Sequence, residues 1–429
     1  MTYSDAIQFL YDLRWFGAKL GLATMRRLAA LAGDPQDRLR FIHVAGTNGK
    51  GSTCAMLESI YRAAGLRVGL FTSPHLVAFG ERIQVNRRPI AKADVARQVA
   101  EVQPWLRQFA PAEHPTFFEV VTLMALRHFV AQKCDLVVWE TGLGGRLDAT
   151  NIVTPLAGII TNIQYDHQQW LGETLAGIAA EKAGIIKPGR PIITGADAPD
   201  ALSVIAQQAR EHNAPLTLVA AADSNRPPLD ALELPLLGRH QRMNAAVAVA
   251  AARVLAPQLP LSDDSLRAGL KRVHWAGRLQ LVSRPSGQQL LLDGAHNVGG
   301  ASALAAALQE HFPAQSPTLI LGILKDKDWP GICRTLAPLA ARILLAPVAN
   351  ERTASPQELG AACGQANPAA PATAHPSLAA ALADAAADPF VLVAGSLYLI
   401  GEAMELLHVS PARAPHERAL NEWSSPSRK

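Results

Sequence analysis

The chain has 429 residues, of which 49% are hydrophobic and 18% are charged, and its formal net charge is +4. This length exceeds what one hydrophobic core usually serves, so we expect two domains. The composition is that of a folded globular protein and excludes a disordered chain. The small net charge, part of which comes from a basic tail after Ser410, indicates no nucleic-acid-binding surface.

The cysteines and the ends of the chain indicate a reducing compartment. The cysteines lie far apart and form no CxxC pair, so the spacing indicates neither a zinc site nor a disulfide framework; they are Cys54, Cys134, Cys333 and Cys363. Asp5 and Asp12 interrupt the N-terminus, which therefore has no apolar core of a signal peptide. The apolar stretch 390–400 is too short to cross a bilayer, so we expect a cytoplasmic protein with no membrane partner.

Short apolar runs alternate with helical stretches, a pattern typical of an α/β protein with parallel strands. A helix over residues 52–64 follows the first run and stops at Gly65. The strands that we expect in the first series are residues 40–44, 68–71, 136–139, 156–160 and 192–194. A second series is expected at 290–292, 319–321, 343–345 and 390–393.

A polar, turn-prone stretch at residues 283–288 separates the two series of strands. We therefore expect an N-terminal domain over residues 1–284 and a C-terminal domain over 288–410. Residues 411–429 are polar and rich in Pro, Ser and Arg, which predicts a mobile tail. The Pro- and Ala-rich stretch 365–376 predicts a loop.

A glycine-rich turn at residues 46–53 stands between the first strand and the first helix. Its glycines allow backbone N–H groups to curl around phosphate oxygens, and the helix N-terminus adds positive potential. Lys50 supplies a compact charge for terminal phosphates. The general P-loop pattern is not met, because a glycine separates Lys50 from Ser52 and Val44 replaces the first glycine. An ordinary turn is the alternative, and the strand–loop–helix context favours a phosphate loop.

Polar side chains follow three further strands of the first series. Ser73 and His75 come after the strand at 68–71, Glu140 closes the next strand, and Asp166 and His167 follow a third. Each residue alone fits a turn or a helix cap. Ligands of open α/β sheets bind at the carboxyl ends of strands, and Mg²⁺ takes few protein ligands beside phosphate and water. Together these residues predict a magnesium site beside the phosphate loop.

Three other features admit two interpretations each. Lys182 fits an exposed helix lysine or a lysine of the site. The loop 293–297, with Asp293 and His296, follows a strand and suits ribose or phosphate contacts. The charged run 325–328 also follows a strand, so it is either a solvated face or part of the site.

The motifs together resemble the dihydrofolate synthase/folylpolyglutamate synthase family, which is related to the Mur ligases. They run in the family's order, and the glycine after Lys50 agrees with both groups. The matching segments are residues 46–52 (GTNGKGS), 71–76 (FTSPHL), 81–86 (ERIQVN), 140–151 (ETGLGGRLDATN), 166–167 (DH), 181–189 (EKAGIIKPG), 238–244 (GRHQRMN), 275–280 (WAGRLQ), 292–297 (LDGAHN) and 322–328 (GILKDKD).

The resemblance implies an N-terminal P-loop ATPase domain with a parallel sheet, a smaller C-terminal Rossmann-like α/β domain, and a site between them. It implies ATP binding by Gly49, Lys50, Gly51, Ser52, Asn244, Arg278 and Asp293. It implies Mg²⁺ sites, two ions in all, at Ser73, Glu140 and His167, and pterin binding by Thr116, Phe117, Phe118, Glu119, Leu147, Asp148 and Ala149. Lys182 matches a lysine that is carbamylated in the family, and His296 matches a residue near the phosphates.

The implied activity is ATP-dependent ligation of L-glutamate to dihydropteroate and to reduced folates through an acyl phosphate, by a monomer. A Mur-type ligase acting on a nucleotide-sugar peptide is the nearest alternative, against which residues 71–76, 81–86 and 116–119 argue. An NTPase switch for a protein partner predicts ATP turnover without a small carboxylate. A non-catalytic nucleotide-binding module has no need of Glu140, His167 and Lys182 together.

Overall fold

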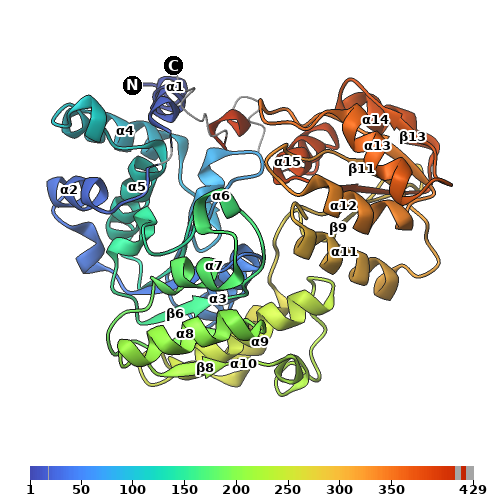
Figure 1. The fold of residues 1–429 in the computed structure, drawn as a ribbon. Helices are drawn as coiled ribbons and strands as arrows, with labels where there is room; N and C mark the ends of the chain where they lie inside the picture. The colour runs from blue at the N-terminus through green and yellow to red at the C-terminus, as the bar shows by residue number, and fades with distance from the viewer. Residues whose placement is uncertain (18, 411–416, 422–429) are drawn as a thin grey trace.

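The protein folds into two lobes, each built around its own sheet (Figure 1). The computed structural model describes residues 1–17, 19–410 and 417–421. Within these residues the first sheet has eight strands in the order β4-β3-β2-β5-β1-β6-β7-β8. They are β1 (Phe41–Ala45), β2 (Val68–Phe71), β3 (Ile83–Val85), β4 (Arg88–Pro89), β5 (Leu136–Glu140), β6 (Ala157–Ile160), β7 (Ile192–Thr194) and β8 (Leu216–Leu218). The six neighbouring strands β2, β5, β1, β6, β7 and β8 are parallel to one another. Strands β3 and β4 add an antiparallel edge beside β2.

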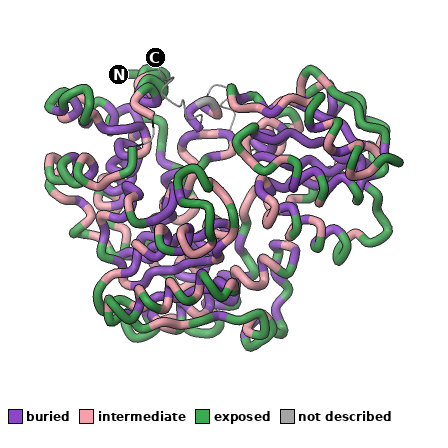
Figure 2. The backbone as a smooth tube through the Cα atoms, viewed as in Figure 1, coloured by how far each residue is buried: buried purple, intermediate pink, exposed green. Residues whose placement is uncertain are grey.

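Helices cover both faces of this sheet, so its strands are apolar on both sides. In β1, Ile42 and Val44 pack on one face while Phe41 and Ala45 pack on the other. The first face is covered by α3 (Lys50–Ala63), α9 (Arg239–Val254) and α10 (Asp263–Lys271). The second face is covered by α1 (Tyr3–Asp12), α2 (Ala23–Leu31), α4 (Lys92–Leu106), α5 (Phe117–Ala131), α7 (Leu175–Ala183) and α8 (Pro199–Glu211). Figure 2 shows the buried strands running through the middle of the lobe.

The second lobe repeats this three-layer plan on a smaller scale. Its six described strands have the order β13-β12-β11-β14-β10-β9, parallel except for β9. They are β9 (Gln280–Ser283), β10 (Gln289–Leu292), β11 (Thr318–Leu321), β12 (Arg342–Leu345), β13 (Ala372–Ala374) and β14 (Phe390–Ala394). One face carries α11 (Val298–His311), α12 (Trp329–Leu336) and α13 (Pro356–Ala366), and the other carries α14 (Leu378–Asp384) and α15 (Leu397–Leu406). The expected α/β class with two lobes is therefore confirmed.

Three segments differ from what the sequence predicts. The turn at 283–288 joins β9 to β10 within the second sheet, so we propose that the C-terminal domain begins before Gln280 rather than at 288. The Pro- and Ala-rich stretch 365–376 contains the end of α13 and the edge strand β13 instead of being a loop throughout. Of the expected mobile tail, residues 411–416 and 422–429 lie outside the described residues, whereas Glu417–Asn421 are packed against the protein. No helix of the described chain is long and apolar enough to cross a membrane.

His43, in the middle of β1, is a buried polar side chain at the centre of the first sheet. Its side chain is fully buried, and its Nε2 lies 2.9 Å from Thr150 Oγ1. Burial, aided by the charge of Lys187, lowers the pKa of His43 to about 3. The imidazole therefore stays neutral in the folded protein near neutral pH.

We predict that His43 contributes to acid sensitivity. Between pH 6.5 and about 3 the unfolded chain protonates this imidazole but the folded protein does not, so the free energy of unfolding falls with falling pH by about 1.4 kcal/mol per unit for this group. His43→Gln should reduce that slope by one proton in urea titrations at several pH values. The exposed His408→Gln is the control, and equal slopes in both variants would contradict the prediction.

Candidate active site

The phosphate loop between β1 and α3 requires glycine at two positions. Gly46 has φ 146°, and a Cβ there would lie 1.9 Å from Thr161 Oγ1. Gly49 has φ 84°, and a Cβ there would lie 2.3 Å from Asn244 Oδ1. L-residues rarely adopt such backbone angles, so both positions need glycine. The loop is thereby held with its backbone exposed to the cavity beside it.

Two lysines meet at this loop. Lys50 Nζ lies 3.0 Å and Lys182 Nζ lies 2.9 Å from the carbonyl oxygen of Gly46. Lys182 is only 4% exposed, so it is not the solvated helix lysine that its sequence context allows. Burial, with the nearby charge of Lys50, lowers the pKa of Lys182 to about 7. At neutral pH a large fraction of this amine is therefore unprotonated.

The residues expected to serve Mg²⁺ converge beside the lysines. Glu140 ends β5, and its Oε2 accepts a hydrogen bond of 3.0 Å from the backbone N–H of Ser73. Burial raises the pKa of Glu140 to about 7, although the charge of Lys50 opposes this shift. His167 stands at the start of α6 (Gln168–Leu171) with φ 52°. Ser73, Glu140 and His167 line the same cavity as the two lysines, and so few protein ligands suit an ion that also takes phosphate and water ligands.

The second lobe reaches this site through two loops at its own strand ends. Asn297 Nδ2 lies 3.0 Å from Asp166 Oδ2, and Asn48 Nδ2 lies 3.0 Å from Asn297 Oδ1. Lys327 Nζ lies 2.5 Å from Asp166 Oδ1. His296 Nε2 lies 3.6 Å from the other oxygen of Asp166. The charged run 325–328 therefore belongs in part to the site, through Lys327.

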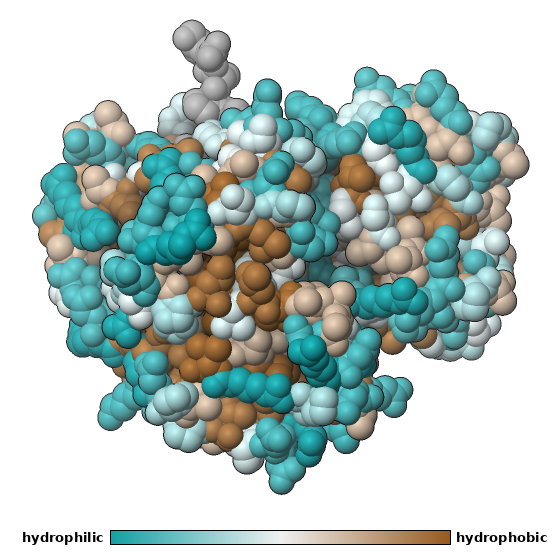
Figure 3. Space-filling view, turned by 60° about the horizontal axis from the view of Figure 1, so that its bottom comes forward, coloured by the Kyte–Doolittle hydropathy of each residue, from teal (hydrophilic) through white to brown (hydrophobic). Residues whose placement is uncertain are grey.

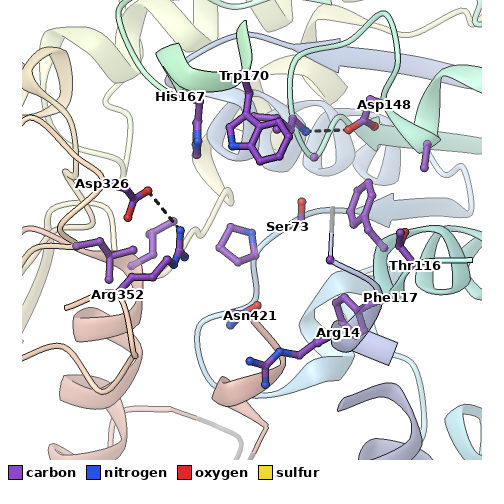
Figure 4. A pocket seen from close by; sticks show the side chains of 18 of the residues that line it. Arg14, Ser73, Thr116, Phe117, Asp148, His167, Trp170, Asp326, Arg352 and Asn421 are labelled. Carbon is purple, nitrogen blue, oxygen red and sulfur yellow. Dashed lines mark hydrogen bonds and ion pairs between the residues drawn. The ribbon is translucent and has the colours of Figure 1, made fainter. Parts of the chain in front are cut away.

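Two adjoining cavities occupy the space between the lobes, where Figure 3 shows the surface hollowed. One cavity, of about 340 Å³, contains the phosphate loop. The other, of about 220 Å³, lies beside α5 and residues 147–149 (Figure 4). They share part of their walls, and the shared residues are Ser73, Pro74, Gly142, Leu143, His167, His296 and Leu397. The two cavities therefore adjoin along these residues.

The residues predicted from the sequence separate between these cavities. The larger cavity is lined by all residues expected for ATP, namely Gly49, Lys50, Gly51, Ser52, Asn244, Arg278 and Asp293, and by Lys182 and Glu140. The smaller is lined by all residues expected for the pterin, namely Thr116, Phe117, Phe118, Glu119, Leu147, Asp148 and Ala149. Sequence reasoning missed Arg14, Trp170 and Asn421, which also line the smaller cavity. None of these three stands in a recognisable motif or at a strand end.

Asp148 is oriented by a chain of buried hydrogen bonds that begins in the sheet. Its Oδ1 accepts from the hydroxyl of Thr150, and its Oδ2 accepts from the backbone N–H of Leu143 at 2.8 Å. Since this hydroxyl donates to Asp148, it must accept from Nε2–H of neutral His43. The Nδ1 atom of His43 has no partner in the described residues, which fits this tautomer. The carboxyl group is thus fixed at the wall of the smaller cavity.

Comparison with known protein families shows the family to which this chain belongs. The Mur ligase middle domain matches residues 44–252, and the glutamate ligase domain of Mur ligases matches residues 277–397. The chain is 37% identical over 423 residues to the dihydrofolate synthase/folylpolyglutamate synthase of Bacillus subtilis, which covers 94% of this chain and 98% of the relative. This chain belongs to that family of Mur ligases.

Other members agree in sequence and in structure. The Escherichia coli dihydrofolate synthase/folylpolyglutamate synthase is 34% identical over 414 residues, covering 94% of each chain. The Mycobacterium tuberculosis folylpolyglutamate synthase complexed with ADP superposes with a TM-score of 0.85 at 31% identity, covering 96% of this chain and 100% of the other. An Escherichia coli structure in complex with DHPP and ADP has a TM-score of 0.82 at 32% identity, covering 95% and 98%. The family membership makes the chain an ATP-dependent ligase.

We predict that Glu140→Gln and His167→Ala each raise the Mg²⁺ concentration needed for half-maximal rate. Each change removes a ligand for a hard cation while leaving the strand that carries it intact. The measurement is the rate as a function of Mg²⁺ at saturating ATP. Glu310→Gln, on the exposed ion pair with Arg239, is the matched control. An unchanged metal requirement in both site variants would count against the metal assignment.

Proposed function

We propose that this ligase joins L-glutamate to dihydropteroate, forming dihydrofolate, and also adds glutamate to reduced folates. The observation that carries the proposal is the meeting of the two cavities at Ser73, His167 and His296. One cavity has the loop, lysines and helix N-terminus that bind phosphates. The other has aromatic walls at Phe117 and Phe118, suited to a flat ring system.

The chemistry follows from the poor reactivity of a carboxylate toward an amine. Transfer of the terminal phosphoryl group of ATP to the carboxylate oxygen gives an acyl phosphate and ADP. The amine of glutamate then attacks the acyl carbon, the tetrahedral intermediate loses phosphate, and the amine gives up a proton. Lys50 lines the larger cavity and would neutralise charge on the transferring group, and the shared wall would keep the two reactants close together.

Water has to be kept away from the acyl phosphate, which it would hydrolyse. The contacts Asp166–Lys327 and Asn48–Asn297 join the two lobes directly beside the shared wall. Closing of the lobes over bound substrates excludes solvent and assembles residues from both sheets. Such a role for the second lobe distinguishes this ligase from an NTPase switch.

Magnesium and a carbamate complete the proposed site. Ser73, Glu140 and His167 would hold Mg²⁺, with two ions in all. The ions would neutralise the charge of the phosphates. The neutral amine of Lys182 captures carbon dioxide to form a carbamate and release a proton. This would convert the neutral amine into an anionic oxygen group, which would offer oxygen atoms for a second Mg²⁺. The buried position of Lys182 and its lowered pKa support the proposal.

A Mur-type ligase acting on a nucleotide-sugar peptide is the alternative. The aromatic wall of the smaller cavity favours a pterin over a peptide. His296, which lines both cavities, is proposed to act near the phosphates. We also propose that the enzyme is a monomer and that it is located in the cytoplasm; both stay predictions.

The direct test is ATP-dependent incorporation of labelled glutamate, with dihydropteroate and tetrahydrofolate supplied separately. We expect product with both, and ADP in equal amount. Lys50→Ala should lower turnover on the order of a hundredfold or more while the protein stays folded, because charge stabilisation at the transferring group is lost. Lys271→Ala, at an exposed helix position, is the matched control. Product with neither acceptor would overturn the proposed function.

We further predict that Lys182→Arg is as inactive as Lys182→Ala. A guanidinium cannot form the carbamate, so both variants lose the anionic oxygen group. Acetate should partly restore Lys182→Ala by occupying the vacated space, and rates are compared with and without it. Substantial activity in Lys182→Arg would show that the residue acts only as a cation and would rule out the carbamate.

A further inference from the structure

A short segment after α15 is packed against both lobes although its composition predicts a solvated tail. We call the described residues Glu417–Asn421 the C-terminal strap; Arg418–Asn421 form the 3₁₀-helix η9. Glu417 is 5% exposed, Leu420 1% and Asn421 2%. In Figure 1 this short helix lies between α15 and the edge of the N-terminal lobe. Polar side chains are buried this deeply only where they have partners.

The strap is joined to the N-terminal lobe by specific hydrogen bonds. The carboxylate of Glu417 accepts from the backbone N–H of Phe79 at 2.7 Å. Asn421 Nδ2 donates to the carbonyl oxygen of His75 at 2.8 Å. Leu420 packs into the apolar cluster that includes α1, α4 and α5. These contacts fix the strap on the loop that follows β2.

The same segment is joined to the C-terminal lobe through α15. Arg418 Nε lies 2.6 Å from Glu405 Oε2, and Arg418 Nη1 lies 3.6 Å from Glu402 Oε2. The hydroxyl of Tyr398 donates to the carbonyl oxygen of Asn421 at 2.8 Å. The strap therefore bridges the lobes at a point distant in sequence from the phosphate loop.

Asn421 also holds the side chain of Arg82, which is 4% exposed. Arg82 Nη2 donates to Asn421 Oδ1, and Arg82 Nε donates to His75 Nδ1 at 2.8 Å. Because Nδ1 of His75 accepts, its Nε2–H donates to the carbonyl oxygen of Glu417 at 2.9 Å. Strap, imidazole and guanidinium thus form one connected network.

This network reaches the substrate cavity. Arg82, Phe117 and Asn421 all line the smaller cavity, and the Arg82 guanidinium carbon lies 5.3 Å from the centre of the Phe117 ring. Figure 4 shows Asn421 on the side of the cavity opposite His167 and Trp170. Buried cations in such a wall are suited to a ligand that carries carboxylate groups.

We propose that the C-terminal strap is part of the folate site, where Asn421 is a positioning residue that holds Arg82 in the cavity wall and ties that wall to α15. This inference rests on the proposed function. Loss of the Asn421 side chain leaves the Arg82 guanidinium with His75 alone of these two partners and loosens the wall of the smaller cavity. Binding of the carboxylate acceptor then weakens while the nucleotide cavity, to which the strap does not contribute, is unchanged.

The test compares Asn421→Ala and Asn421→Asp with the unmodified chain. We expect Asn421→Ala to raise the KM for dihydropteroate about tenfold, the effect of losing a hydrogen bond to a charged group. The KM for ATP should change less than about twofold. Asn421→Asp keeps an oxygen acceptor for Arg82 and should recover most of the loss. Asn225→Ala, exposed on η6 (Ala221–Asn225), is the matched control.

A binding measurement separates this inference from the proposed function. Dihydropteroate binding is measured by equilibrium dialysis in the presence of a nonhydrolysable ATP analogue, together with thermal unfolding of each variant. If the unmodified chain binds no dihydropteroate, the proposed function fails. If it binds, a folded Asn421→Ala with unchanged affinity overturns the role of the strap. Equal weakening of dihydropteroate and ATP would likewise overturn it, since that result indicates a general structural role.

Discussion

Opposite charges are buried together at the carboxyl ends of two parallel sheets, and the rest of the structure serves to hold them there. Burial favours the neutral forms of both Glu140 and Lys182, and it brings the pKa of each to about 7 from opposite directions. Groups with such environments are tolerated because bound ligands complete their charge balance. Phosphates and cations are the natural complement of this set, which explains why lysines, a carboxylate and an imidazole share one cavity.

The division of the chain into two lobes also serves to enclose these buried charged groups and their ligands. Neither sheet alone closes the site, since Asp166 lies on the first lobe and its partners Lys327 and Asn297 lie on the second. The main hydrophobic cores of the lobes are separate, although Leu76 and Val77 of the first lobe pack into a core cluster of the second, and the contacts beside the shared wall are polar. Polar contacts of this kind permit opening for substrates and closing for reaction. The C-terminal strap, through its contacts with α15 at Arg418 and Tyr398, also connects the lobes beside the smaller cavity.

Much of the fold and of the site can be predicted from the sequence, because the site residues directly follow strands that are recognisable as apolar runs. Runs such as Val68–Phe71 are apolar on both faces, which marks buried parallel strands, and the polar residues that follow them necessarily gather at one edge of the sheet. The short strands β9 and β13 lie at sheet edges and depend on tertiary pairing, so local pattern does not predict them. Asn421 lies in a stretch with the composition of a tail, and only the contacts with Arg82 and His75 give it a place.

In the proposed reaction the carboxylate in one cavity accepts the phosphoryl group of ATP from the other. It is tested by supplying dihydropteroate labelled with ¹⁸O in its carboxylate, with ATP and L-glutamate, and analysing the released phosphate by mass spectrometry. An acyl phosphate requires that one labelled oxygen leave with each phosphate when the amide forms. Unlabelled phosphate, or label released in AMP, would contradict an acyl phosphate intermediate.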